Sequence, residues 1–142
     1  MAYDKPLPHI TPLARPFWEG TRAHELRLQR CRACGNFQFP PQVLCRACLA
    51  EEQDWTATSG KATVYSFVVQ HRPATPAFVD DLPYVVAVVE LDEGPLMLTN
   101  IVECAPDEVE VGMPVEVTFI DATDEITLYP FRPRPKVVNP RS

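Results

Sequence analysis

Hydrophobic and polar residues follow two different patterns along this chain, and the change falls after Trp55. Residues 62–70 alternate as in a half-buried strand and include β-branched and aromatic side chains. Residues 83–91 are almost wholly apolar, and an Asp-Glu-Gly-Pro turn joins them to the next apolar segment as a hairpin. The expected strands cover residues 62–70, 83–91, 96–102, 115–120 and 126–131. Five short strands with one helical interruption are typical of a five-stranded barrel of the OB type, and a small open sandwich is the alternative.

A short helix is expected ahead of the cysteine-rich part of the chain. Thr11 followed by Pro12 is typical of a helix start, with Thr11 as the N-cap and Pro12 at the first helical position. Phe17 and Trp18 would then lie on one side of a helix that ends near His24. Phe17 is expected in the core, whereas Trp18 suits either the core or a partner surface.

Four cysteines form two Cys-x₂-Cys pairs separated by ten residues: Cys31, Cys34, Cys45 and Cys48. A two-residue gap lets both thiolates of a pair approach one ion at about 2.3 Å, the usual zinc–sulfur distance. Gly35 is placed to turn the chain after the first pair. Four thiolates leave zinc no open position, so the sequence predicts one structural zinc ion. An iron centre of rubredoxin type and two disulfides are the alternatives.

Proline is frequent and glycine rare, at 16 and 5 residues, and many prolines gather at the two ends of the chain. This composition predicts extended connections around a compact body. We therefore expect a mainly β protein in four segments. They are an N-terminal arm and helix at 1–24, a zinc ribbon at 25–54, an OB-fold barrel at 55–131 and a basic tail at 132–142.

The net charge of −6 is distributed unevenly. Residues 51–131 contain sixteen acidic side chains against two basic ones, whereas the segments on both sides are basic. OB barrels and zinc ribbons often bind nucleic acid, but this acidic barrel would repel a phosphate backbone, so we expect no nucleic-acid partner and keep that function as an alternative. The apolar runs are far shorter than the ~20 residues of a membrane-spanning helix, and the first ten residues lack the apolar segment of a signal peptide. We therefore expect a cytoplasmic protein without membrane contact, in which clustered cysteines bind metal.

A fifth cysteine, Cys104, follows the third expected strand. As a catalytic nucleophile it would need a base within hydrogen-bond reach, and the chain offers only His9, His24 and His71. None of these histidines lies in a recognisable partner motif. We interpret Cys104 as a small, half-buried apolar residue, and a free-standing enzyme stays as an alternative.

Several motifs occur together in an order that is shared with one protein family. They are Phe17-Trp18-Glu19-Gly20, residues 25–31, residues 39–41, the second cysteine pair, Ser59-Gly60, residues 82–91 and residues 107–117. In this combination, over residues 12–131, the chain resembles the OB-fold proteins with a rubredoxin-like zinc ribbon, once catalogued as domain of unknown function thirty-five. Each motif alone is unspecific, and the combination carries the resemblance.

The resemblance implies an accessory subunit that is not itself catalytic. Members of this family are small companions of thiolase-like enzymes, acyl-CoA hydratases and related aldolases, and they are implied to dock on the enzyme and help bind or pass acyl-CoA. For this chain it implies a hetero-oligomer with such an enzyme, structural zinc on the four cysteines, and acyl-CoA as a ligand. A pure scaffold that binds its partner but no CoA is the alternative.

A CoA site requires cations for the phosphates and an apolar groove for the acyl-pantetheine arm. The long connection at 70–78 contains Arg72, the only arginine between residues 51 and 131, together with His71 and Phe78. These three are the candidate CoA-contacting residues, although Arg72 could instead neutralise a nearby aspartate in a proline-rich crossover. Other candidate phosphate ligands are Arg30, Arg32, Arg46, Arg132, Arg134 and Lys136.

Overall fold

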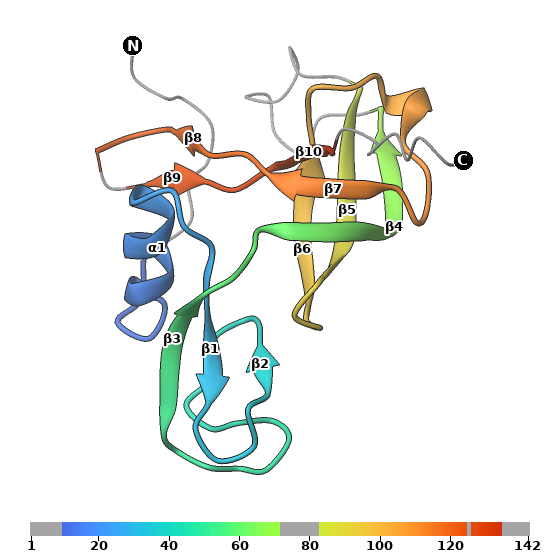
Figure 1. The fold of residues 1–142 in the computed structure, drawn as a ribbon. Coiled ribbons are helices and arrows are strands. Elements are labelled where there is room, and N and C mark those ends of the chain that lie inside the picture. The colour runs from blue at the N-terminus through green and yellow to red at the C-terminus, as the bar shows by residue number, and fades with distance from the viewer. Residues whose placement is uncertain (1–9, 72–82, 125, 135–142) are drawn as a thin grey trace, which may run out of the picture.

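The computed structural model describes residues 10–71, 83–124 and 126–134. These residues form one α-helix, one short 3₁₀ turn and a series of β-strands, which confirms the mainly β class. Figure 1 shows a small sheet that extends away from a barrel, with the helix lying beside the junction of the two. Among the described residues, no helix is long and apolar enough to cross a membrane.

Helix α1 spans Arg15–Arg22 and begins later than the sequence predicts. Ala14 occupies the N-cap position, and the Thr11 hydroxyl accepts a hydrogen bond from the Ala14 N–H at 3.2 Å. Thr11 therefore stabilises the turn before the helix, and its prediction as the N-cap was wrong. The helix ends before His24, as expected, and His24 itself has a φ of 58°.

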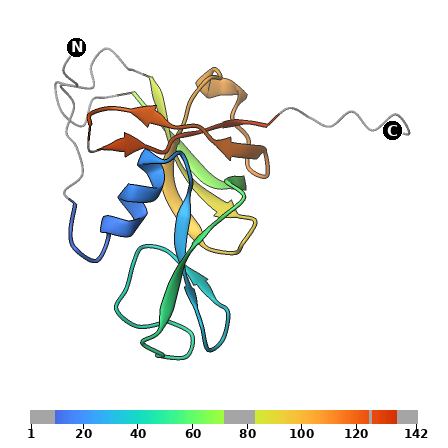
Figure 2. The ribbon, with the colours of Figure 1, turned by 60° about the vertical axis from the view of Figure 1, so that its left-hand side comes forward.

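The small sheet is the ribbon predicted around the cysteines. It contains β1 (Arg27–Cys31), β2 (Phe37–Gln38) and β3 (Gln53–Ala57), with β1 in the centre and antiparallel to both neighbours. Strands β2 and β3 were not predicted, because β2 is only two residues long and β3 has no clear alternation of buried and exposed positions. Figure 2 shows that β3 continues into the barrel, whereas β1 follows helix α1.

Five strands close into a barrel in the order β10-β6-β5-β4-β7, which confirms the OB-type barrel. Strand β4 is the longest, and it pairs with β5 over most of its length and with β7 over its first residues. A register shift between Val64 and Ser66 bends β4, which allows it to pair with both β5 and β7. The strands are β4 (Lys61–Gln70), β5 (Tyr84–Leu91), β6 (Leu96–Ile101), β7 (Pro114–Val117) and β10 (Phe131–Pro133).

The chain between β7 and β10 differs from the expected fourth and fifth strands. It forms a separate hairpin of β8 (Ile120–Asp121) and β9 (Thr127–Leu128), which packs against α1. The predicted continuous strand over 126–131 was therefore wrong, and so was the prediction that the fourth strand extends to residue 120. Pro130 lacks the N–H that a continuous ladder would use.

One apolar core runs from the helix into the barrel. Phe17 lies at the junction, and its ring centroid is 5.0 Å from Trp18, 5.4 Å from Phe39 and 5.1 Å from Tyr129. These partners come from the helix, the ribbon and the segment before β10. Phe17 is thus in the core as expected, and Trp18 is also buried, at 8% exposure.

Candidate functional site

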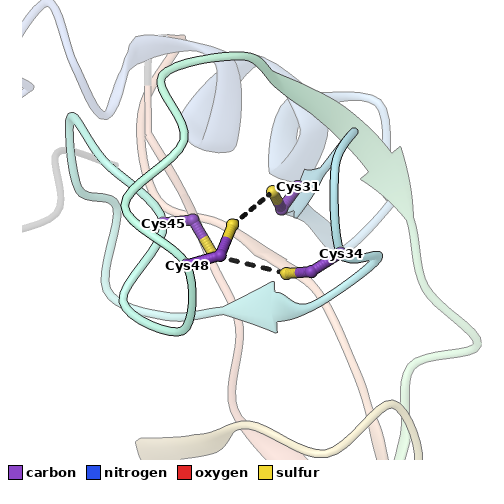
Figure 3. A group of neighbouring side chains, drawn as sticks. All are labelled: Cys31, Cys34, Cys45 and Cys48. Carbon is purple, nitrogen blue, oxygen red and sulfur yellow. Dashed lines mark hydrogen bonds between the residues drawn. The ribbon is translucent and has the colours of Figure 1, made fainter.

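Four cysteine side chains converge in the ribbon, as Figure 3 shows. Cys31 ends β1 and Cys34 lies in the turn after it, whereas Cys45 and Cys48 lie in the loop between β2 and β3. All four sulfur atoms lie within 4.8 Å of one another. The Sγ atoms of Cys31 and Cys48 are 3.5 Å apart, and those of Cys34 and Cys45 are 3.6 Å apart. These separations exceed the about 2.05 Å of a disulfide bond, and all four cysteines are free thiols.

The two Cys-x₂-Cys turns share one backbone geometry. The Gly35 N–H donates to the Cys31 carbonyl at 2.9 Å, and the Leu49 N–H donates to the Cys45 carbonyl at 2.8 Å. The residue after each pair has a positive φ, 76° at Gly35 and 65° at Leu49. Glycine adopts this conformation readily, as the sequence predicted, whereas a leucine there was not anticipated because its Cβ disfavours it.

Opposing electrostatic effects act on the sulfur atoms. The Cys48 N–H, with a smaller effect of the Ala47 N–H, lowers the pKa of Cys45 to about 6 against the effect of burial, since N–H groups stabilise a thiolate. The Ala50 N–H also lowers the pKa of Cys48. Hydrogen bonding with Cys31, burial, and the sulfurs of Cys34 and Cys45 outweigh this effect and raise the pKa of Cys48 to about 12. Sulfurs this close do not all ionise together unless a cation lies between them.

The cluster fits a zinc ion in geometry and in chemistry. A tetrahedron with zinc–sulfur bonds of 2.3 Å has sulfur–sulfur edges of about 3.8 Å, which falls between the 3.5 Å and 4.8 Å found here. A set of four soft sulfur donors suits zinc, and it leaves no coordination position for a substrate or water. The site is therefore of the structural kind.

Buried glutamines support the loop that carries the second cysteine pair. Gln29 and Gln38 are each 4% exposed. Gln38 Nε2 donates to Oε1 of Gln29 and of Gln53, both at 3.0 Å, and Gln38 Oε1 accepts from the Arg46 N–H at 3.0 Å. Gln29 holds the backbone of Gln42 through both its amide atoms, at 2.9 and 2.8 Å. Sequence reasoning missed this network, because a buried glutamine cannot be told from an exposed one in a sequence.

The predicted CoA-contacting loop is described only at its start. His71 follows β4 directly and is exposed, whereas Arg72 and Phe78 lie outside the described residues. Their joint role in CoA binding stays a prediction.

An apolar cavity of about 670 Å³ lies between the barrel strands β5 and β6, the β8–β9 hairpin and helix α1. Its size is within the range of small-molecule sites. Among the described residues, its wall includes no lysine, arginine or histidine, and its one carboxylate, Glu103, pairs with Arg132 at 3.5 Å. Thr99 donates to the Tyr129 carbonyl at 2.9 Å, and Asn100 donates to the Val85 carbonyl at 3.0 Å. The apolar part of the wall includes Trp18, Tyr84, Leu98, Ile120, Leu128 and Tyr129.

Cys104 lies in the wall of this cavity and is half-buried. Burial, and to a smaller extent the charge of Glu108, raises the pKa of its thiol. Within the described part of the chain, the side chain forms no hydrogen bond. These features fit the interpretation of Cys104 as a small apolar residue.

Most of the other candidate phosphate ligands are engaged within the chain. The described contacts are those of Arg30 over the Phe37 ring at 5.1 Å, Arg32 with Asp54 at 2.9 Å, Arg132 with Glu116 at 3.3 Å, and Arg134 with the Ala62 carbonyl at 3.2 Å. Lys136 lies outside the described residues. Arg46 differs, because its guanidinium makes no ion pair or hydrogen bond with the described part of the chain.

Fold and site together define a class of small proteins in which a Cys₄ zinc ribbon precedes an OB-fold barrel. Residues 18–53 match the family model described as the rubredoxin-like zinc ribbon domain of ChsH2, and residues 55–119 match that of its C-terminal OB-fold domain. The chain belongs to this family, also known as DUF35, as the sequence resemblance implied.

The named relatives include scaffold proteins that are matched over almost their whole length and enzyme subunits that are matched over only part of it. A DUF35 domain-containing scaffold protein of Methanothermobacter thermautotrophicus is 34% identical over 132 residues, which are 89% of this chain and 98% of that protein. A probable enoyl-CoA hydratase alpha subunit of Thermomonospora curvata is 44% identical over 118 residues, which are 82% of this chain. The matched part is 36% of that subunit, so the chain spans about a third of its length.

A solved structure described as the Ltp2-ChsH2(DUF35) aldolase contains a chain of the same fold. It superposes with a TM-score of 0.81 at 41% sequence identity, and the match covers 89% of this chain and 98% of that chain.

Proposed function

We propose that this chain is a non-catalytic accessory subunit that docks on an acyl-CoA enzyme, such as a thiolase-like enzyme, a hydratase or an aldolase. The proposal is carried by the match over 98% of a chain in the Ltp2-ChsH2(DUF35) aldolase structure. The names of the archaeal scaffold protein and the hydratase alpha subunit support the same role. The raised pKa of Cys104 disfavours a thiolate nucleophile, which supports a subunit without chemistry of its own. Free cysteines suit a reducing compartment such as the cytoplasm.

The metal in this proposal has a structural task. One zinc ion would be held by Cys31, Cys34, Cys45 and Cys48. Sulfur would fill all four of its coordination positions, so the ion would bind no catalytic water. The two cysteine turns would then be fixed relative to β1, and the ribbon would present a rigid surface to its partner.

The apolar cavity is the proposed place for the acyl part of a CoA ester. Its volume and its largely aliphatic and aromatic wall suit a hydrocarbon chain. Pro83 and Tyr84 belong to the wall, and the segment with Arg72 and Phe78 joins β5 at this point. His71, which follows β4 directly, and Arg72 stay the predicted contacts for the CoA phosphates.

Affinity purification of the tagged chain from its native extract tests the accessory role. We expect an enzyme that acts on acyl-CoA to co-purify in a fixed stoichiometry, identified by mass spectrometry and confirmed by size-exclusion chromatography of the complex. Recovery of the chain alone, or of nucleic acid with it, would contradict the proposal.

Alkylation of Cys104 tests the acyl site separately. In the zinc-loaded complex, acyl-CoA should slow the reaction of Cys104 with N-ethylmaleimide several-fold, measured on the Cys104 peptide by mass spectrometry, and free CoA should slow it less. Leu98→Glu puts a carboxylate into the wall at an exposed position and should abolish the protection, while Val111→Glu, at an equally exposed site outside the wall, should not. If acyl-CoA gave no protection, a pure scaffold without CoA binding would be the better description.

A further inference from the structure

The second cysteine turn places an exposed leucine where its geometry favours glycine. Gly35 and Leu49 occupy equivalent positions after the two cysteine pairs, and both have a positive φ. A leucine in this conformation is less stable than a glycine because its Cβ approaches the following carbonyl. Leu49 is also 70% exposed, so burial does not offset this cost. Residues in strained backbone conformations cluster at functional sites, so this exposed leucine is an indication of function.

The same loop exposes further apolar side chains beside one free cation. Val43 is 71% exposed and Leu44 is 38% exposed. Arg46 is exposed and forms no ion pair or hydrogen bond through its guanidinium within the described residues. We name Val43, Leu44, Arg46 and Leu49 the knuckle tip. Figures 1 and 2 show that the loop between β2 and β3 runs from beside β1 to the end of the ribbon that is far from the barrel.

The backbone of the knuckle tip is held in place on both sides. The Leu49 N–H donates to the Cys45 carbonyl at 2.8 Å, and the Cys45 N–H donates to the Ala50 carbonyl at 2.9 Å. The Arg46 N–H donates to buried Gln38 at 3.0 Å, and Gln38 also donates to the Leu44 carbonyl at 3.2 Å. A surface that is already ordered loses little conformational entropy when a partner binds.

We propose that the knuckle tip is the contact through which this chain docks on the enzyme subunit of its complex, which deepens and rests on the proposed function. Leu49 enters an apolar recess of the enzyme subunit, and Arg46 pairs with a carboxylate at the rim of that recess. Arginine is enriched among the residues that dominate binding energy in interfaces, whereas the role of Leu49 is inferred from its exposed, strained position. The exposed guanidinium of Arg46 would be matched by a carboxylate on the partner surface.

The charges around the knuckle tip favour a protein partner over a nucleic acid. Glu51 and Glu52 follow the second cysteine turn and are exposed. Arg32 is neutralised by Asp54 at 2.9 Å and does not add to the charge of Arg46. A single free cation next to two carboxylates gives little attraction for a phosphate backbone, whereas it suits one carboxylate of a protein.

The substitution Leu49→Gly tests the proposal because it should change stability and binding in opposite directions. It removes the backbone strain, so the melting temperature of the zinc-loaded chain should rise by about 2–4 °C. It also removes the anchor, so the affinity for the enzyme subunit purified with the tagged wild-type chain should fall at least about ten-fold. Arg46→Glu should weaken binding to a similar degree without raising the melting temperature. Val111→Ser, at a site that is 68% exposed in the barrel, should leave binding unchanged.

Each other outcome would overturn the proposal. Unchanged affinity of Leu49→Gly and Arg46→Glu would leave the accessory role intact and remove the knuckle tip from the interface. A melting temperature that falls together with zinc content would show that Leu49 is a packing element. Self-association of the wild-type chain that Leu49→Gly abolishes would assign the tip to a second copy of the chain. If the wild-type chain bound no acyl-CoA enzyme, the proposed function itself would fail, and the inference with it.

Discussion

The ribbon and the barrel share one continuous core, but they bury different kinds of side chain. The barrel encloses apolar residues on alternating positions, such as Val85, Ala87 and Val89 on β5, each at most 1% exposed. The ribbon buries Leu26 and Leu28 next to the helix, and around its loops it buries Gln29 and Gln38 together with Cys31 and Cys45. A segment of this size encloses too little apolar surface to be stable by burial alone. The barrel is therefore stabilised by the hydrophobic effect, and the ribbon by metal binding and amide hydrogen bonds.

Removal of the metal should separate the two regions most clearly. Cys31→Ser should abolish stoichiometric zinc binding and unfold the ribbon, because structural zinc in small modules contributes about 10–16 kcal/mol of binding energy to folding. Hydrogen exchange should then show loss of protection in β1 to β3, while β5 and β6 stay protected. Cys104→Ser should retain one zinc per chain. A soluble Cys31→Ser variant with protected ribbon amides would contradict the structural role of the metal.

Exchange of a buried amide in the ribbon for an apolar side chain should have a smaller effect. Gln38→Met keeps the length of the side chain, but it leaves the Arg46 N–H without its acceptor and Gln53 Oε1 without this donor, which costs about 2–3 kcal/mol. Because those bonds hold the loop of the second cysteine pair, zinc should also be released faster to a chelator.

Val89→Ala is the matched change in the barrel, at a residue that is 0% exposed. It should lower the free energy of unfolding by about 1–3 kcal/mol through a cavity, while the rate of zinc release stays the same. If Gln38→Met and Val89→Ala released zinc at the same rate, the buried amides of the ribbon would have no special role in holding the metal site.

The two regions also differed in how far their structure could be predicted from the sequence. Alternation identified β4, and apolar runs bounded by turn residues identified β5 and β6, each within one residue or two of its observed ends. The cysteine spacing predicted the cluster that the structure forms. The glutamine network left no such signal, since buried and exposed glutamines look alike in a sequence. Likewise the break at Pro130 was missed because apolar residues continue through it.

The junction between the regions offers the last and smallest test. Asp121 on β8 accepts hydrogen bonds from His24 Nε2 at 3.0 Å and from Thr127 Oγ1 at 2.8 Å, and thereby connects the end of α1 with the β8–β9 hairpin. The bond from His24, then that from Thr127, lowers the pKa of the Asp121 carboxyl below its ordinary 3.8. A carboxyl with a lowered folded-state pKa stabilises the protein fully above its unfolded-state value, and this contribution is lost as the pH falls through the folded-state value.

Asp121→Asn should therefore melt at a lower temperature than the wild type near neutral pH, by less than Gln38→Met does, because the pair is exposed to solvent. The difference should shrink as the pH falls below 3.8, the ordinary value for this carboxyl. Asp92→Asn, at an exposed turn carboxylate, is the control and should show no such dependence. If the Asp121→Asn difference kept its full size well below that pH, the junction would be held by packing around Phe17 and Tyr129 and not by this charged bond.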